Sequence, residues 1–201
     1  FIIYQLGWLA QQGVHDVVIS IGYRGELISR AIGDGRKFGL SVTYADEGET
    51  LRGTGGALRM IADLGSLAPS VFLLYGDSYL PIDGLPVWHT SDDGRFPTMT
   101  VLRNSGRWDR SNVVFRDDRV VLYDKHAIDP AAHAMDYIDY GLSVLTRDAI
   151  VEEFSADETA DLARLLNKLS RQGVLRGHEV FERFYEIGSP QGLDDFAAYV
   201  A

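Results

Sequence analysis

The sequence predicts an α/β fold with a mixed, mostly parallel Rossmann-like sheet flanked by helices. In the first half of the chain, short apolar runs rich in β-branched residues alternate with segments of helical periodicity, and this alternation favours right-handed crossovers between parallel strands. The predicted strands there are residues 15–23, 40–46 and 71–77, and the predicted helices are residues 1–12 and 24–34, with residues 53–64 expected to form a glycine-rich turn that leads into a helix. With 201 residues, 46% of them hydrophobic, the chain is long enough for one substantial core, so we expect a single domain over residues 1–201.

The second half of the chain predicts a mixed sheet, because short strands follow one another with turns between them. Asp117 and Asp118 suit a hairpin turn between two of these strands, and Ser189 followed by Pro190 is typical of the start of a helix. The predicted strands are residues 98–104, 111–117, 119–125, 135–146 and 178–188, and the predicted helices are residues 85–95, 148–154, 158–169 and 189–201.

Composition and charge argue against several classes of function. A formal net charge of −10 without a basic cluster would repel a phosphate backbone, so nucleic acid is not an expected partner. The chain has no cysteine, and therefore neither a disulfide framework nor a thiolate metal site, which fits a cytoplasmic protein. No run approaches the ~18 apolar residues of a membrane span, so we expect no membrane partner. Whether the protein is a homo-oligomer is left open by the sequence.

Acidic residues follow several predicted strands, at the edge where open α/β sheets bind their ligands. Asp77 ends the run VFLLYG, which resembles a fully buried strand, and Glu186 ends the predicted last strand. Two carboxylates brought together at such an edge provide the hard oxygen ligands that suit Mg²⁺, which in turn holds the phosphates of a nucleotide. The alternative is that each is an ordinary solvated acid at a strand end, and position alone does not decide between the two.

The segment RGTGGAL, residues 52–58, predicts a glycine-rich turn that leads into a helix. Glycine allows backbone N–H groups to approach an anion or a nucleobase closely, and the N-terminus of a helix favours negative charge. The lysine and hydroxyl of a Walker A loop are absent, and the spacing is not that of the dinucleotide fingerprint. The segment is therefore either a cradle for a ligand or a plain turn before a helix.

Five segments occur in the order seen in sugar-1-phosphate nucleotidyltransferases, and the chain resembles that family over essentially its full length. The segments are GTGGAL (53–58), LLYGDSYL (73–80), VLYDK (121–125), YIDYGLSVL (137–145) and YEIGSPQGL (185–193). Each motif is weak alone, but five in order make a strong signal. Within the family, the chain looks most like bacterial mannose-1-phosphate or D-glycero-D-manno-heptose-1-phosphate guanylyltransferases.

The resemblance implies a reaction in which a sugar 1-phosphate attacks the α-phosphate of a nucleoside triphosphate. The products are a nucleotide sugar for polysaccharide or glycoconjugate synthesis and pyrophosphate. GTP with mannose- or heptose-1-phosphate is the first substrate pair that the resemblance implies, and Mg²⁺ is the implied cofactor. Chemistry of this type depends mostly on positioning and on neutralisation of charge.

Matched position by position, the resemblance implies a metal and nucleotide side of the site. Asp77 matches the catalytic aspartate that ligates Mg²⁺ after the central strand, and Glu186 falls where the family usually has a second metal-binding Asp. The implied nucleotide-binding residues are Glu47, Gly53, Thr54 and Gly76, with Glu49 as the alternative to Glu47 for reading the base.

The resemblance also implies a sugar side of the site. Asp124 and Lys125 match a Glu-Lys pair that contacts the sugar and its phosphate, and Lys125 has a catalytic role there as a point charge on the attacking phosphate. Asp139 and Gly141 match an Asn-x-Gly segment that holds sugar hydroxyls. Asp in place of Asn, like Glu at residue 186, is a departure from the family pattern.

Members of the family open with a strand, a G-x-G-T-R loop and a Pro-Lys pair that grip the triphosphate, and the residues before Phe1 that would correspond to them are not in the sequence. We therefore expect an N-terminally truncated sheet and little or no turnover from this chain alone. A non-catalytic regulatory subunit of the same fold, which binds a nucleotide sugar, is an alternative. A glycosyltransferase of GT-A architecture is another, but it would normally place a second acid two residues after Asp77, where Tyr79 stands.

Overall fold

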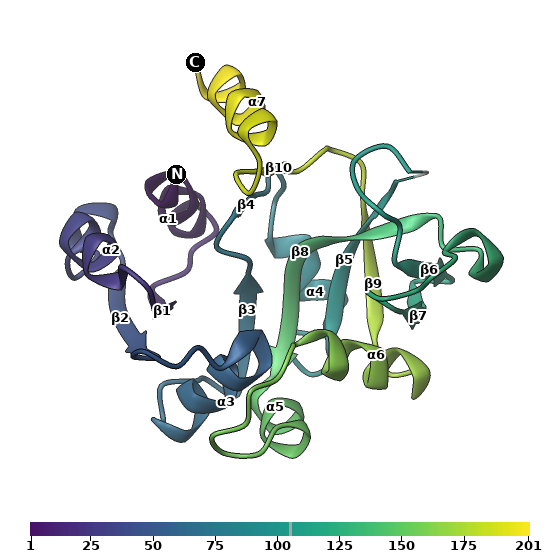
Figure 1. Cartoon of the computed structure of the whole chain (residues 1–201), viewed down its shortest axis with the longest axis horizontal. Coiled ribbons are helices and arrows are strands. Elements are labelled where there is room, and N and C mark those ends of the chain that lie inside the picture. The colour runs from purple at the N-terminus through teal and green to yellow at the C-terminus, as the bar shows by residue number, and fades with distance from the viewer. Residues whose placement is uncertain (105) are drawn as a thin grey trace. The chain divides into compact units, whose positions relative to one another are not determined.

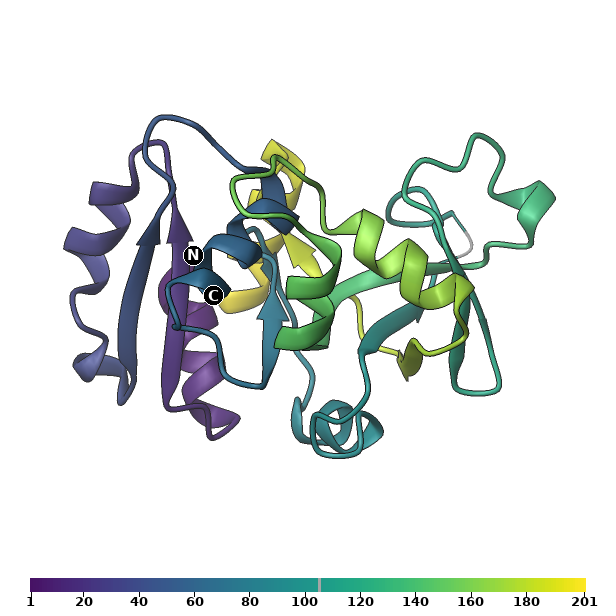
Figure 2. The ribbon, with the colours of Figure 1, turned by 90° about the horizontal axis from the view of Figure 1, so that it is seen from below.

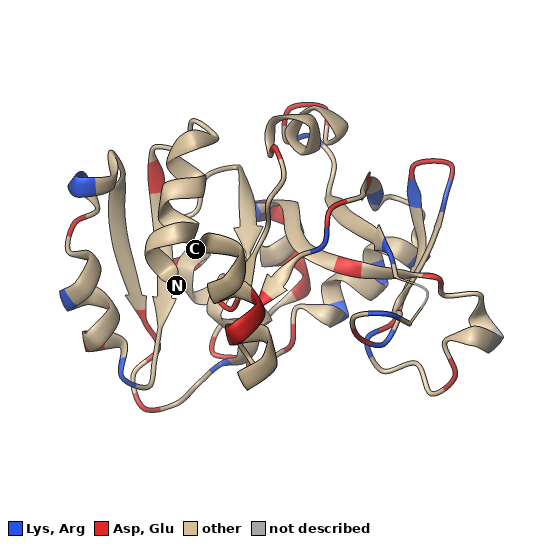
Figure 3. Ribbon diagram, turned by 90° about the horizontal axis from the view of Figure 1, so that it is seen from above, with Lys and Arg blue, Asp and Glu red and all other residues tan. Residues whose placement is uncertain are grey.

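The structure, a computed structural model, describes residues 1–104 and 106–201 and divides into two compact units. Unit 1 consists of Phe1–Pro69 and Arg147–Leu165, and unit 2 consists of Ser70–Thr146 and Leu166–Ala201. In each unit, Lys and Arg are scattered among Asp and Glu along the ribbon (Figure 3). Among the described residues, no helix has both the length and the apolar character needed to cross a membrane.

Unit 1 is built on two parallel strands, which lie side by side and run in the same direction in Figure 2. These are β1 (Asp16–Ile21) and β2 (Ser41–Asp46), paired along their full lengths. The helical elements of the unit are α1 (Ile2–Gln11), α2 (Gly25–Ile32), the 3-10 helix η1 (Arg36–Phe38), α3 (Gly53–Asp63) and α5 (Arg147–Glu153). The alternation of helix and parallel strand predicted for this part of the chain is confirmed.

Unit 2 contains a six-stranded sheet in which β8 (Tyr137–Thr146) lies between β3 (Ser70–Leu74) and β5 (Thr98–Arg103) (Figure 1). The strand order is β3-β8-β5-β9-β7-β6, with β6 also touching β8. The other strands are β6 (Val113–Arg116), β7 (Arg119–Tyr123) and β9 (Arg176–Val180), and a separate short pair is formed by β4 (Ser78–Tyr79) and β10 (Tyr185–Glu186). The helical elements are α4 (Leu85–Thr90), the 3-10 helix η2 (Ala131–His133) and α7 (Pro190–Val200).

The helix α6 (Ala163–Arg171) includes residues of both units. The sequence predicts that this helix starts at residue 158, and the structure starts it five residues later. The predicted last strand, residues 178–188, is two strands, β9 and β10. The predicted start of the final helix is confirmed, because the Ser189 hydroxyl accepts the N–H of Gly192 as an N-cap.

The core of unit 2 lies on its two central strands. The hydrophobic side chains of β5 and β8 that are no more than 1% exposed are Met99, Val101, Tyr140, Leu142, Val144 and Leu145. By contrast, all five residues of β3 are half-buried, although VFLLYG resembles a fully buried strand. In the described part of the chain β3 pairs with β8 alone, so only one of its edges is covered by another strand.

The predicted mostly parallel sheet is confirmed only as a mixed α/β fold. β8 runs antiparallel to both β3 and β5, and β6 and β7 form an antiparallel hairpin. Only β1–β2 and β5–β9 are parallel pairs among the described strands. The hairpin has a local cause: Asp117 and Asp118 take φ values of 49° and 56°, as a two-residue turn between antiparallel strands requires.

Candidate active site

A bulge in β8 sets the positions of Asp139 and Gly141. The register between β5 and β8 shifts around Thr100. The Thr100 hydroxyl replaces the backbone hydrogen bonds that the strand pair lacks at this point. It donates to the carbonyl oxygen of Leu142 at 2.7 Å and accepts the Leu142 N–H at 3.3 Å. Gly141 has a φ of 103°, which residues with a side chain rarely adopt. The bulge is therefore stabilised by specific residues, and it changes the direction in which the side chains of this part of β8 point.

The Asp139 carboxylate is half-buried and held by neighbouring donors. Its Oδ1 accepts the N–H of Gly141 at 3.0 Å, and its Oδ2 accepts the Tyr75 hydroxyl at 3.1 Å. Loss of water by burial raises the pKa of Asp139 to about 6, while these two hydrogen bonds and the positive charge of Lys125 oppose the rise. The carboxyl group therefore changes its charge near neutral pH.

The turn after β7 is connected to Asp139 through Asn112. The N–H of Asp124 donates to the carbonyl oxygen of Asn112 at 2.9 Å, and the N–H of Asp139 donates to Asn112 Oδ1 at 3.0 Å. Asp124 Oδ1 accepts the N–H of His126 at 2.9 Å and so closes the turn that carries Lys125. The structure thus brings together the four residues of the predicted sugar side, namely Asp124, Lys125, Asp139 and Gly141.

The two predicted metal ligands converge at the short β4–β10 pair. Glu186 pairs with Ser78, and the N–H of Ile187 donates to the carbonyl oxygen of Asp77 at 3.0 Å. A methyl group on Gly188 would lie 3.0 Å from Glu186 Oε2 and 4.0 Å from Asp77 Oδ2. Both carboxylates therefore border the same small volume.

The Glu186 carboxylate is held in place by the loop that follows it. Its Oε2 accepts the N–H groups of Gly188 and Ser189 at 2.6 and 3.1 Å, and its Oε1 accepts the Ser189 hydroxyl at 2.6 Å. Two carboxylates fit Mg²⁺, which usually binds one or two carboxylates together with water and substrate phosphates. The described residues contain no cluster of three or more His, Asp or Glu that could hold a metal ion, so an ion held by these two carboxylates would complete its coordination with water or with oxygens of a substrate. Gly76, the predicted nucleotide contact between β3 and β4, has open space where a side chain would begin, because a methyl group there would meet no atom within 4 Å other than those of its chain neighbours.

In unit 1, the Glu47 carboxylate stabilises the loop between β2 and α3 by accepting hydrogen bonds. Its Oε2 accepts the N–H of Arg52 at 2.7 Å and its Oε1 accepts the Ser20 hydroxyl at 3.1 Å. The alternative base reader, Glu49, lies in the same loop and is exposed. The half-buried Glu47 therefore shapes the loop, and its carboxylate still has lone pairs that could accept from a ligand.

The glycine segment is the first turn of α3, and the sequence expectation of a turn ahead of the helix needs this correction. Its polar groups bind the segment that follows α5, because the carbonyl oxygen of Ala160 accepts the N–H groups of Gly55 and Gly56 at 2.8 and 3.3 Å. The Thr54 hydroxyl accepts the N–H of Leu162 at 2.9 Å. These groups are used by the fold itself.

Close packing explains why glycines occupy this turn. A methyl group on Gly55 would lie 2.5 Å from the Phe154 ring, and one on Gly56 would lie 2.2 Å from the carbonyl oxygen of Glu158. Gly53, with a φ of 69°, starts the helix in a conformation that favours glycine. Of the two readings that the sequence leaves open, the structure therefore supports a structural turn for Gly55 and Gly56.

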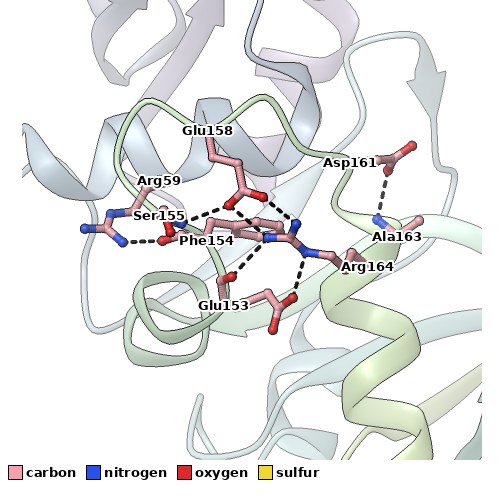
Figure 4. A network of polar contacts seen from close by, with 8 residues as sticks. All are labelled: Arg59, Glu153, Phe154, Ser155, Glu158, Asp161, Ala163 and Arg164. Carbon is pink, nitrogen blue, oxygen red and sulfur yellow. Dashed lines mark hydrogen bonds and ion pairs between the residues drawn. The ribbon is translucent and has the colours of Figure 1, made fainter.

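A polar network holds the segment after α5 in place (Figure 4). Arg164 donates from Nε to Glu153 Oε1 at 2.8 Å and from Nη2 to Glu158 Oε2 at 3.0 Å. The hydrogen bonds that Arg164 donates to Glu158, together with one from the N–H of Ser155, lower the pKa of Glu158 to about 2. Arg59 of α3 donates to the carbonyl oxygen of Phe154. The network therefore connects the two ends of the segment after α5, which is the segment that the glycine turn of α3 packs against.

Sequence reasoning missed two residues of this site, Tyr75 and Asn112. Tyr75 directly precedes the Gly76-Asp77 motif, so its position could have marked it as a neighbour of the site. Asn112 lies just before β6, and its polar side chain beside a buried strand was the available signal.

Comparison with known proteins finds sequence relatives that cover nearly the whole chain. The chain is 26% identical over 202 residues to the D-glycero-alpha-D-manno-heptose 1-phosphate guanylyltransferase of Aneurinibacillus thermoaerophilus, covering 98% of the chain and 81% of the relative. It is 24% identical over 196 residues to the protein of the same name in Campylobacter jejuni, covering 98% of the chain and 84% of the relative. No protein-family model matches the chain.

A solved structure shares the fold. It is described as a putative glucose-1-phosphate thymidylyltransferase from Bacillus anthracis in complex with a sucrose, and it matches with a TM-score of 0.82 at 17% identity over 98% of this chain and 81% of the other. The predicted resemblance to sugar-1-phosphate nucleotidyltransferases is confirmed by the sequence relatives and by this shared fold.

Proposed function

We propose that the chain transfers a nucleotidyl group from a nucleoside triphosphate to a sugar 1-phosphate, with GTP and mannose- or heptose-1-phosphate as the first pair to test. The observation that carries this proposal is the convergence of Asp124, Lys125 and Asp139 around Asn112. The named activities of the sequence relatives, which are guanylyltransferases for a heptose 1-phosphate, support the choice of substrate class.

In this reaction an oxygen of the sugar phosphate forms a bond to the α-phosphorus while the bond to the pyrophosphate leaving group breaks. The Lys125 ammonium lowers the repulsion between the sugar phosphate and the triphosphate, and it holds the attacking oxygen in line. The Asp139 carboxylate accepts from a sugar hydroxyl above its pKa of about 6. Asp124 fixes the turn that presents Lys125.

Asp77 and Glu186 would hold Mg²⁺, and the ion would neutralise charge on the triphosphate. The backbone at both residues is held by hydrogen bonds, and the Glu186 carboxylate is also held by the loop that follows it. We assign Glu47, Gly53, Thr54 and Gly76 to the nucleotide. Thr54 would act on the nucleotide by shaping the turn and not by direct contact of its hydroxyl, because that hydroxyl already accepts the Leu162 N–H.

Pyrophosphate release by the complete gene product tests the proposal. The panel contains four nucleoside triphosphates and the 1-phosphates of mannose, glucose and heptose, each with Mg²⁺. We expect release that is fastest with GTP and that is lost in Asp77→Ala. The matched control is Asp194→Ala, which removes an exposed acid from α7.

Absence of release throughout the panel would contradict the proposal, as would release that Asp77→Ala leaves unchanged. Tight binding of GDP-mannose without release would instead support the regulatory subunit of the same fold.

A further inference from the structure

Asn112 stands where the two parts of the sugar side meet. Its main-chain N–H donates to the carbonyl oxygen of Tyr137 at 3.0 Å, and its carbonyl oxygen accepts the N–H of Asp124 at 2.9 Å. Its side chain crosses to β8, where Oδ1 accepts the N–H of Asp139 at 3.0 Å. A single residue therefore connects β8 and the turn after β7.

The hydrogen bond to Asp139 also fixes which way the amide faces. A backbone N–H can pair only with an acceptor, so the side-chain atom facing Asp139 is the oxygen and the opposite atom is the nitrogen. Asn112 Nδ2 makes no hydrogen bond with any described residue and is not one of the buried unpaired atoms, so it reaches solvent. The residue is half-buried, which holds the amide in place. Asn112 thus presents an oriented, unused pair of N–H donors.

The chemistry of the neighbouring groups shows what such a donor would serve. Asp124 and Asp139 are acceptors when ionised, and Lys125 is a cation suited to a phosphate. A sugar hydroxyl is both donor and acceptor, so carboxylates alone would satisfy only its proton. An amide N–H beside them would donate to the lone pair of the same hydroxyl or of the next one.

We propose that Asn112 recognises the sugar by donating a hydrogen bond from Nδ2 to a hydroxyl of the bound sugar 1-phosphate. This inference rests on the proposed function, and it assigns a specificity residue that the sequence motifs do not include. Asp is a poor substitute at this position, because it would keep the acceptor for Asp139 but would replace the donor with a negative charge close to two other carboxylates.

Binding of deoxy sugars to the complete gene product tests the inference without requiring turnover. The probes are α-D-mannose 1-phosphate and its 2-, 3-, 4- and 6-deoxy analogues, titrated by calorimetry into the parent, Asn112→Ala and Asn112→Asp. The control is Gln172→Ala, which removes an exposed amide from unit 2. Thermal unfolding of each variant reports separately on folding.

In the parent, we expect that removal of one particular hydroxyl weakens binding about tenfold, which is the usual effect of one neutral hydrogen bond. In Asn112→Ala, removal of the same hydroxyl should not weaken sugar 1-phosphate binding any further. Asn112→Asp should bind the sugar 1-phosphate more weakly than Asn112→Ala does. Gln172→Ala should behave as the parent.

The inference would be overturned if the parent binds mannose 1-phosphate and Asn112→Ala loses affinity for the same deoxy analogues, by the same factors, as the parent does. The proposed function would remain intact in that case. Equal weakening towards every analogue together with a lower unfolding temperature would assign Asn112 a purely structural role and would also overturn it. A parent that binds no sugar 1-phosphate would contradict the proposed function itself.

Discussion

The first turn of α3 in unit 1 and the ends of β7 and β8 in unit 2 both carry residues predicted to touch a substrate, but their polar groups have different partners. At the turn of α3, the N–H groups of Gly55 and Gly56 and the hydroxyl of Thr54 bind the segment after α5. At the ends of β7 and β8, the N–H groups of Asp124 and Asp139 also bind within the fold, yet the amide nitrogen of Asn112 makes no hydrogen bond with any described residue.

The difference separates two uses of polar residues near a site. Glycines and a threonine at the start of a helix resemble an anion cradle in sequence, but the same residues also allow another segment to pack closely and cap the helix with its own carbonyl. Donors that the fold orients and that have no partner among the described residues, as at Asn112, are those that a ligand can use.

Gly56→Ala should destabilise the protein by about 3 kcal/mol, because the new methyl group would meet the backbone oxygen of Glu158 at 2.2 Å. For a chain of this size the unfolding midpoint should fall by roughly 6–12 °C, measured by circular dichroism. The control is Gly7→Ala in α1, where the site has open space and the helix should gain about 0.5–1 kcal/mol. Equal midpoints for Gly56→Ala and the parent would contradict the packing role of the turn.

Lys125→Ala should weaken the binding of mannose 1-phosphate about 10- to 100-fold, since it removes a charged contact to the phosphate. Its effect on folding should be small. The same change should raise the pKa of Asp139 further, because the Lys125 charge lowers it in the parent. Calorimetric titration gives the affinity, and Lys168→Ala, at an exposed position of α6, is the control. If Lys125→Ala binds mannose 1-phosphate as tightly as the parent, the sugar phosphate does not bind at Lys125.

Asp139→Asn should make stability less dependent on pH. The folded pKa of about 6 lies above the ordinary value of 3.8, so the folded state holds its proton more tightly than the unfolded chain, and the unfolding free energy falls as the pH rises from about 4 to 6. Asn imitates the protonated form. After allowance for solvent screening, the variant should gain about 1–2 kcal/mol over the parent at pH 7 and nothing at pH 4. Urea denaturation at both pH values measures the difference, and a gain independent of pH would refute the assignment to Asp139.

Thr54→Val should cost about 1 kcal/mol of stability, because the Leu162 N–H loses its acceptor. Thr54→Ser keeps the hydroxyl and serves as the control. If the turn acts on a nucleotide only through its shape, both variants should bind GTP with nearly the affinity of the parent. A marked loss of GTP affinity in Thr54→Val at unchanged stability would show that this hydroxyl is reserved for a ligand, and the contrast between the two regions would then fail.

Much of the fold could be predicted because apolar runs and turn residues mark individual elements. The hairpin at Asp117 and Asp118 and the N-cap at Ser189 follow from local chemistry and are confirmed. The direction of β8 could not be predicted, since the period of a strand is the same whether its neighbour is parallel or antiparallel. That β3 has a strand neighbour on one edge only, among the described strands, depends equally on which strands pair, and no local pattern contains that information.

The candidate site shows the same limit. Asp124, Lys125 and Asp139 could be selected because strand ends and motifs mark them. The bulge at Gly141 depends on the register with Thr100, and the role of Gly56 depends on a segment about a hundred residues later in the chain. Asn112 acts through bonds to residues 12 and 27 positions away, so only the folded structure reveals its orientation.

The most direct test of the account is an amide NMR titration of the isotopically labelled complete gene product with α-D-mannose 1-phosphate. If the sugar phosphate binds at the ends of β7 and β8, we expect saturable shifts of the Asn112 side-chain NH₂ and of the backbone amides of Lys125 and Gly141, and none at Gly55 or Gly56. Shifts confined to Gly55 and Gly56, with the signals of Asn112 and Lys125 unchanged, would contradict a sugar-phosphate site at the ends of β7 and β8.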